Sequence, residues 1–340
     1  MATATFGFFD FDERCAQLRE AGNPLVLLDE MIGFEAFRPI LERVRDRDRK
    51  NSSGRKAFDV VLMFKILILR TLYNLSDDQL EYQIRDRISF MEFLGLQLGD
   101  RVPDAKTIWL FRDELSKLEL ADRLFEQFDD DLIVAGFTAR KGSIVDASIV
   151  EAPRQRNTRE ENEQIKSGVM PASFTKNPCK QRQKDTDARW LTKNKVRHFG
   201  YKNHVNVDVK YKLIRKYAVT DASVHDSQLI ESLLDEKNTN ADVYGDSAYR
   251  SAAIHEHLES HDYRDRIHRK GYRNKPLTES QREANRRKSR VRSRVEHVFG
   301  RLAQCLGGTW LRCIGIVRAK TMIGLRNLVY NMDRYVKLVT

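Results

Sequence analysis

Apolar residues recur at three- and four-residue spacing through roughly the first 135 positions of the chain, the period of amphipathic helices. Between two such runs, Ser76 and Asp77 form a typical helix start. The runs cover, in chain order, residues 58–75, 78–94, 104–118 and 120–132. The pattern therefore predicts an all-helical amino-terminal domain over residues 1–138.

Two short helices, a turn containing Gly and Pro, and a third helix starting at Asp104 resemble a helix-turn-helix unit. In such a unit the last helix can enter the major groove of DNA. This part of the chain is net acidic, however, so a helical bundle used for packing or dimerisation is an equally good interpretation. Both roles remain open for residues 1–138.

The pattern changes at residue 140, where β-branched and alternating stretches replace the helical period. It predicts three antiparallel strands, a crossover helix, a fourth strand and a short fifth strand. Their ranges are 143–150, 200–209, 213–220, 226–234 for the helix, 241–246 and 263–269. This order is that of a ribonuclease-H-like fold. We therefore expect a mixed α/β chain whose catalytic domain, 139–340, has a mixed five-stranded sheet and flanking helices.

Two basic segments interrupt or follow this sheet. Residues 153–197 show no periodicity and hold 12 Lys and Arg against 5 Asp and Glu, which predicts a flexible basic insertion. A long basic helix is predicted over residues 278–303.

The net charge of +11 is unevenly distributed: residues 1–150 carry −6 and residues 151–340 carry +17. Such asymmetry favours a polyanionic partner, most often nucleic acid, because each neutralised phosphate adds affinity. The alternative is a basic surface that is merely solvated.

Several other classes of protein are disfavoured. No apolar run reaches the length of a membrane-spanning helix, and the first residues lack the features of a secretion signal, so we expect a cytoplasmic location. The four cysteines form no Cys-x-x-Cys pair, which disfavours a disulfide framework or a zinc site.

Three carboxylates are candidates for a metal site. Asp146 interrupts the first strand and Asp246 ends the fourth, which neighbours the first in such a sheet. Buried carboxylates are costly unless they are paired or bind metal, although both could instead cap strand ends in solvent. Glu296 lies one helical turn after Arg292 on the basic helix and is the best third ligand. An Arg292–Glu296 surface pair is the alternative, and Glu283 is a rival.

The segments around these acids resemble the acidic triad of bacterial insertion-sequence DDE transposases, specifically the insertion-sequence-five group. They are Ile-Val-Asp146-Ala-Ser, Tyr-Gly-Asp246-Ser-Ala-Tyr-Arg-Ser and Arg292-x-x-x-Glu296-x-x-Phe-Gly-x-Leu. Segments 198–204, 219–228, 64–81 and 102–112 are also similar to that group. At two positions of the group's fuller signature, this chain has Ser289 instead of Tyr and Ala303 instead of Lys.

The resemblance implies an enzyme of DNA recombination that cleaves the ends of an insertion sequence and transfers the freed 3′-hydroxyls into target DNA. Asp146, Asp246 and Glu296 would bind two Mg2+ ions, with Mn2+ as a substitute. The residues expected to contact DNA are Arg290, Arg292, Arg294, Arg301, Lys202 and Tyr201. The implied partners are double-stranded DNA, as terminal inverted repeats and target, and a second copy of the chain in a homodimer or larger synaptic complex. No membrane partner is expected, and the location would be the nucleoid.

Two other functions remain compatible with the sequence. One is a catalytically inactive or domesticated protein that only binds DNA. The other is a metal-dependent nuclease that cuts without joining, because one fold can host several chemistries.

Overall fold

The computed structural model describes residues 9–46, 56–273, 275–307 and 309–340. The chain divides into two compact units, Met1–Phe128 with Leu325–Thr340, and Asp129–Gly324. Each unit is described separately. The predicted functional division at residue 138 stays a prediction. None of the described helices is long and apolar enough to cross a membrane.

The first unit is helical, as predicted. Its core is α4 (Val60–Leu72), which is apolar around nearly its whole circumference and is therefore buried. Ser76 caps α5 with a capping box completed by Gln79, which confirms the helix start expected there. The other helices are α1 (Asp10–Glu20), α2 (Pro24–Met31), η1 (Phe34–Phe37), α3 (Arg38–Glu42), η2 (Arg43–Arg45), α5 (Asp77–Asp86), α6 (Ile88–Leu94), α7 (Ala105–Lys117) and α8 (Leu120–Val134), which runs into the second unit.

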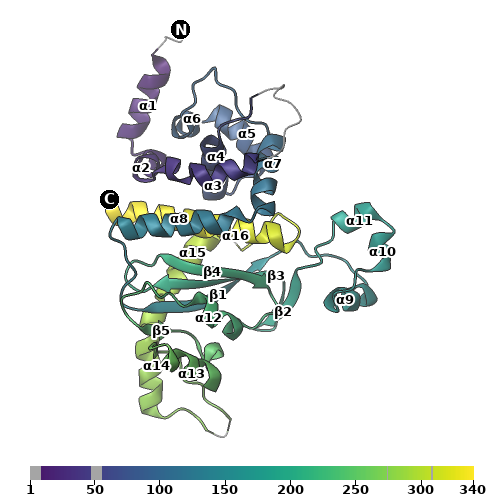
Figure 1. The fold of residues 1–340 in the computed structure, drawn as a ribbon, viewed down its shortest axis with the longest axis vertical. Helices are drawn as coiled ribbons and strands as arrows, with labels where there is room; N and C mark the ends of the chain where they lie inside the picture. Colours follow the sequence, from purple (N-terminus) through teal and green to yellow (C-terminus); the bar gives the residue numbers. More distant parts are fainter. Residues whose placement is uncertain (1–8, 47–55, 274, 308) are drawn as a thin grey trace, which may run out of the picture. The chain divides into compact units, whose positions relative to one another are not determined.

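The second unit is built on a mixed sheet with the order β2-β3-β1-β5-β6, and β4 also pairs with β3 (Figure 1). β3 pairs antiparallel with β1 and β4, whereas β5 runs parallel to β1, so the predicted order of strands and crossover helix is confirmed. The strands are β1 (Ser143–Glu151), β2 (Arg189–Lys193), β3 (Val196–Asp208), β4 (Ile214–Asp221), β5 (Asp242–Tyr244) and β6 (Arg264–Asp265). The sheet has six strands, so the expectation of five was wrong.

The additional strand, β2, comes from the segment 153–197, where no regular structure was predicted. That segment also contains α9 (Arg159–Lys166), α10 (Ala172–Thr175) and α11 (Pro178–Arg182), which Figure 1 shows grouped beside the β2 end of the sheet. The fully buried Phe174 provides a small apolar centre for this group. Helices of one or two turns are too short to produce a recognisable period, which explains the error.

The two faces of the sheet are both covered. Val150, Tyr201 and Val219 contribute to a core cluster with Ala319 and Ile323 in the first part of α16 (Ile316–Val339). The opposite face packs Val145 and Val243 in a second cluster. That cluster also draws on the segments η3 (Asp226–Leu229), α12 (Ile230–Leu233), η4 (Ser247–Tyr249) and α13 (Ala252–Ser260).

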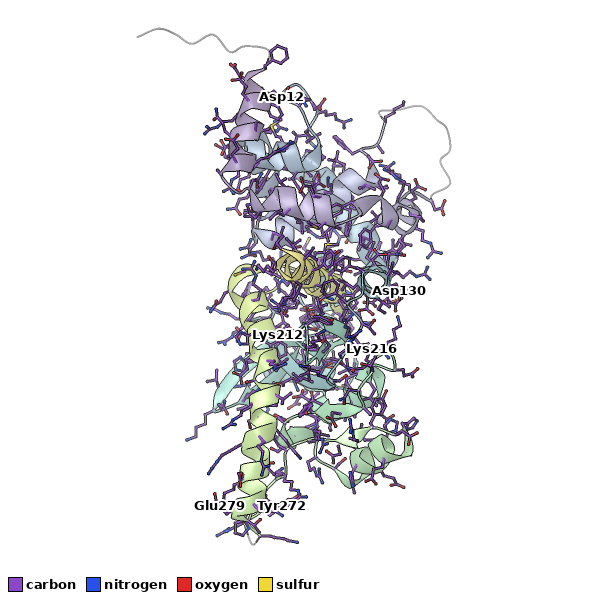
Figure 2. The ribbon with its side chains drawn as sticks, turned by 90° about the vertical axis from the view of Figure 1, so that its left-hand side faces the viewer. Asp12, Asp130, Lys212, Lys216, Tyr272 and Glu279 are labelled. Atoms are coloured by element: carbon purple, nitrogen blue, oxygen red, sulfur yellow. The ribbon has the colours of Figure 1, made fainter. Side chains whose placement is uncertain are left out.

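The predicted basic helix over residues 278–303 is two helices. α14 (Glu279–Arg292) ends at Ser293, and α15 (Arg294–Cys305) follows directly. Figure 2 shows the long side chains along α14, with Glu279 at its first residue and Tyr272 in the preceding loop. Val295, Val298 and Leu302 form the buried face of α15.

Candidate active site

Asp146 and Asp246 follow the ends of a short parallel pairing. β5 pairs with β1 only through Ser143 and Ile144, so Asp146 lies just beyond the paired segment of its strand. Asp246 follows β5, where its carboxylate accepts the Ala248 N–H at 2.7 Å. The two side chains therefore extend from the same ends of neighbouring parallel strands, a position where α/β sheets commonly bind ligands.

The Asp146 carboxylate is largely buried and has two partners. One oxygen accepts the backbone N–H of Ala147 at 2.8 Å, and the other accepts Arg292 Nη1 at 2.7 Å. Burial raises the pKa of Asp146, the Ala147 N–H and Arg292 oppose that rise, and the negative charge of Asp246 adds to it. The two aspartates are thus within electrostatic range of each other.

Arg292 also connects Asp146 with Glu296. Its Nη2 lies 3.8 Å from Glu296 Oε1, and the Glu296 side chain is 67% exposed in the first turn of α15. Glu283, the rival candidate, is exposed on α14 and pairs with Arg287 at 3.2 Å. Among the described contacts, only Glu296 is linked to Asp146, through a shared arginine.

A buried tyrosine, Tyr249, lies within electrostatic range of three aspartates, which we call the acidic group: Asp146, Asp226 and Asp246. Tyr249 is 1% exposed, and its hydroxyl has no hydrogen-bond partner in the described structure. Burial and then the negative charges of Asp226, Asp146 and Asp246 raise its pKa. Asp226 was not among the predicted site residues, because an acidic residue at the start of a predicted helix is most simply interpreted as a helix-terminal residue.

Two predicted DNA contacts are occupied within the protein. Tyr201 is fully buried, and its hydroxyl donates to both carboxylate oxygens of Asp185 at 2.8 Å, so its role as a DNA contact stays a prediction. Lys202 is also buried: its Nζ lies 2.8 Å from Asp226 Oδ1 and donates to the Val224 carbonyl at 2.7 Å. In this structure Lys202 pairs with Asp226 in the protein interior and is not on an exposed surface.

The four predicted arginines have different surroundings. Arg290 is exposed on α14, whereas Arg292 is engaged with Asp146. Arg294 donates to the Val209 carbonyl, and Arg301 is partly buried on α15. Ser289, which stands at the signature tyrosine position, lies 3.3 Å from His268 Nε2 through its hydroxyl.

The basic β2–β3 hairpin lies within electrostatic range of Asp146. The exposed turn between β2 and β3 carries Lys193 and Lys195, and Lys193 is among the charges that lower the pKa of Asp146. Trp190 on β2 is 38% exposed, with the Arg197 guanidinium 4.8 Å from its ring centroid. Stacked aromatic and cationic side chains of this kind suit a nucleic-acid surface. The hairpin was not predicted from the sequence, because this segment has no regular spacing of apolar residues.

The chemistry of the donor set fits a hard divalent cation. Carboxylate oxygens favour Mg2+ or Mn2+, and no cysteine takes part. Within the described ranges, no three His, Cys, Asp or Glu side chains are arranged to hold an ion. Arg292 instead neutralises Asp146, so binding an ion there requires the Arg292 side chain to move.

Comparison with known proteins gives two family matches and one similar structure. Residues 138–332 match the family described as Transposase DDE domain, and residues 13–114 match Transposase domain (DUF772). A cryo-EM structure of piggyBac transposase in a synaptic complex with hairpin DNA is also similar. It is 12% identical, with a TM-score of 0.49, and the match covers 93% of this chain and 75% of that chain.

Proposed function

The chain belongs to the DDE transposase family, and we propose that Asp146, Asp246 and Glu296 form its catalytic centre. Enzymes of this family cut and join DNA in a reaction that depends on divalent metal ions. The observation that carries the proposal is the position of Asp146 and Asp246 at the ends of two paired parallel strands, with Arg292 between Asp146 and Glu296.

The three carboxylates would hold two Mg2+ ions, with Mn2+ as a substitute, which when bound neutralise charge on the attacking and leaving oxygens. The protein contributes the fixed strand positions of the two aspartates. It also contributes the burial that keeps bulk water away from Asp146. The acid on α15 is exposed and lies in the first turn after the helix break at Ser293, so it has room to approach the aspartates.

Arg292 would exchange partners during the reaction. In the free protein the Arg292 guanidinium neutralises Asp146. A cation held by the Asp146 carboxylate would replace Arg292 as its counter-charge. The released guanidinium can then donate two parallel hydrogen bonds to a phosphate at the DNA end. Arg292 would thereby couple cation binding at the carboxylates to DNA binding.

The β2–β3 hairpin and the arginines of α14 and α15 would hold the DNA. Lys193, Lys195 and Arg197 supply cations, and Trp190 offers an aromatic face for stacking. Arg290, Arg294 and Arg301 extend the basic surface along the helices. The substrates would be the terminal inverted repeats of the element and its target DNA, which locates the protein at the nucleoid.

The helical unit would serve end recognition or dimerisation. Its α5, α6 and α7 include the segment that resembles a helix-turn-helix, and Asp77 joins α5 to α7 through an ion pair with Arg112. Membership of the insertion-sequence-five group and assembly as a homodimer or larger synaptic complex are further parts of the proposal.

A cleavage and joining assay tests the catalytic centre. The full chain is incubated with Mg2+ and duplexes carrying the element's two ends, and nicked and joined products are counted. We expect Asp146→Asn, Asp246→Asn and Glu296→Gln each to reduce both products at least roughly a hundred-fold, because a lost ligand removes several kcal/mol of transition-state stabilisation. Glu283→Gln is the matched control on the neighbouring helix.

The same assay separates the alternative functions. Nicked products without joined products would indicate a nuclease that does not transfer strands. Intact DNA affinity with no product from the unsubstituted chain would indicate a protein that only binds DNA. Full activity of the three carboxylate variants would contradict the proposed centre.

A further inference from the structure

We propose that Asp226 is a fourth carboxylate of the catalytic centre and a ligand of its divalent cation, oriented by Lys202. The inference rests on the proposed function, because it assigns a further residue to the same site. Four observations support it: the position of η3, an unpartnered buried hydroxyl, the contacts of Asp226 and the balance of charge.

The position of Asp226 follows from the crossover of the fold. After β4 the chain turns into η3, whose first residue is Asp226, and η3 packs against η4. η4 begins one residue after Asp246, and Asp246 is its cap. The crossover segment therefore brings Asp226 to the end of the sheet from which Asp246 extends.

The Tyr249 hydroxyl points to a ligand between these acids. A buried hydroxyl without a hydrogen bond is unfavourable and needs an explanation. This hydroxyl lies within range of the charges of Asp226, Asp146, Asp246 and Arg292, yet it donates to none of them. A hydrated cation bound between the carboxylates would supply the missing partner, because its coordinated water can donate a hydrogen bond to the phenol oxygen.

The contacts of Asp226 leave it able to bind a cation. In the described part of the chain, Lys202 is the only lysine or arginine within ion-pair distance of it, and the buried oxygen Oδ1 makes no well-directed hydrogen bond. His204 Nδ1 lies 4.0 Å from the same oxygen and is likewise unpartnered. Lys202 is fixed by the Val224 carbonyl, so it holds Asp226 in a single orientation.

The charges of the group are unbalanced. Arg292 neutralises Asp146 and Lys202 neutralises Asp226, whereas Asp246 has no ion pair among the described residues. With the exposed Glu296, four acids have two ion-paired cations, Arg292 and Lys202, and Lys193 as a more distant third. When Arg292 moves to DNA, the excess of negative charge suits hard divalent cations with oxygen ligands.

Titration calorimetry with Mn2+ on the full chain without DNA tests the assignment. We expect Asp226→Asn to weaken Mn2+ binding roughly ten-fold or more. The matched control is Asp221→Asn at the last residue of β4, where the carboxylate accepts the Ser223 N–H at 2.8 Å. That variant should bind Mn2+ as the unsubstituted chain does. Unchanged Mn2+ affinity in Asp226→Asn would overturn the assignment.

A double variant distinguishes two roles of Asp226: binding the cation, and merely neutralising Lys202. Asp226→Asn with Lys202→Met removes both buried charges, so it keeps the test valid even where the single variant folds poorly. If Asp226 is a ligand, thermal stability recovers in the double variant but Mn2+ affinity stays weak. Recovery of both properties would show that Asp226 only balances the lysine, contrary to the proposal.

The centre itself is tested in the same titrations. If Asp146→Asn and Asp246→Asn lose Mn2+ binding while Asp226→Asn keeps it, only the role of Asp226 is wrong. If all three variants bind Mn2+ normally, the proposed centre and the assignment of Asp226 fail together.

Discussion

At the residue scale, Asp146 illustrates the cost of burying a carboxylate for chemistry. Burial raises its pKa despite the Ala147 N–H and Arg292, so the ionised form is less favourable in the folded chain than in the unfolded one. A group with a raised folded-state pKa stabilises the protein below its unfolded pKa, and that contribution is lost as the pH rises through the folded pKa. At neutral pH, Asp146 therefore reduces the stability of the metal-free protein.

Asp146→Asn should accordingly stabilise the protein while abolishing catalysis. We expect the free energy of unfolding to rise by about 0.5–1 kcal/mol at pH 7.5 in EDTA, as in other cases where stability and activity oppose each other. The gain should shrink as the pH falls, since the native aspartate then becomes protonated. Urea denaturation across this pH range measures it, with Asp221→Asn as the control. A less stable Asp146→Asn would mean that the ion pair with Arg292 outweighs burial.

Tyr201, which the sequence predicts as a DNA contact, has a buried hydrogen bond that stabilises the fold. Asp185 is buried and accepts the Tyr201 hydroxyl together with the N–H groups of Asp187, Ala188 and Gly315. Tyr201→Phe removes one hydrogen bond to a buried carboxylate, which should cost about 1–2 kcal/mol. DNA affinity should be unchanged. Denaturant titration and a DNA-binding isotherm test the two statements, and a large loss of DNA affinity at full stability would support Tyr201 as a DNA contact.

The burial of Tyr201 and Lys202 was not expected from the sequence, and this has a physical cause. Both lie in a stretch rich in Lys and His, which suggests an exposed basic surface. β3, however, is paired on both sides, by β1 and by β2 and β4, and both faces of the sheet are covered. Residues 199–208 are consequently all buried. Sequence spacing predicts alternation along a strand, but it does not reveal whether the second face is also covered.

At the scale of elements, the β2–β3 hairpin gathers basic and aromatic side chains, namely Lys193, Lys195, Arg197 and Trp190. Asn194 and Lys195 at its turn both have positive φ, 52° and 64°, as in the tight turns that match strand twist. Lys193, the last residue of β2, is among the charges that lower the pKa of Asp146, and the Arg197 guanidinium lies over the Trp190 ring. We propose that the hairpin holds a DNA strand for the proposed catalytic carboxylates.

Lys193→Ala with Lys195→Ala should weaken DNA binding and make it less sensitive to salt. Each phosphate contact contributes about 0.9 to the slope of log K against log salt, so the slope should fall by about 2. Fluorescence anisotropy with a duplex at several salt concentrations measures this change. The matched control is Lys210→Ala with Lys212→Ala at the β3–β4 turn. Equal effects of the two double variants would indicate a diffuse basic surface without a special role for the hairpin.

Elements were predictable where they were long or strongly patterned. The order of the strands, the positions of Asp146 and Asp246 and the buried face of α15 follow from alternation and helical spacing. The break at Ser293 could not be predicted from the sequence, because its backbone stays near helical angles and the apolar pattern continues across it. Asp226 was missed as a site residue because its function depends on η3 packing against η4, which no local pattern encodes.

At the scale of the whole molecule, charge and chemistry are concentrated in the same part of the chain. Residues 151–340 carry +17, and all of the proposed catalytic acids lie within Asp129–Gly324. Electrostatic attraction therefore brings DNA to the unit that holds the carboxylates. The acidic first 150 residues lack this general attraction, so a contribution to DNA binding there must come from specific contacts.

This arrangement leads to a prediction about stoichiometry. We propose one group of catalytic acids in each chain, whereas an element has two ends to be cut and joined, so we expect two chains to act in one complex. We expect Glu296→Gln, which should not cut DNA, to form a complex of two 39.7 kDa chains with two end duplexes. Light scattering after size-exclusion chromatography measures its mass, and an unrelated duplex is the control. A joining-competent complex of one chain on one end would contradict the expectation, because a single centre would then process each end in turn.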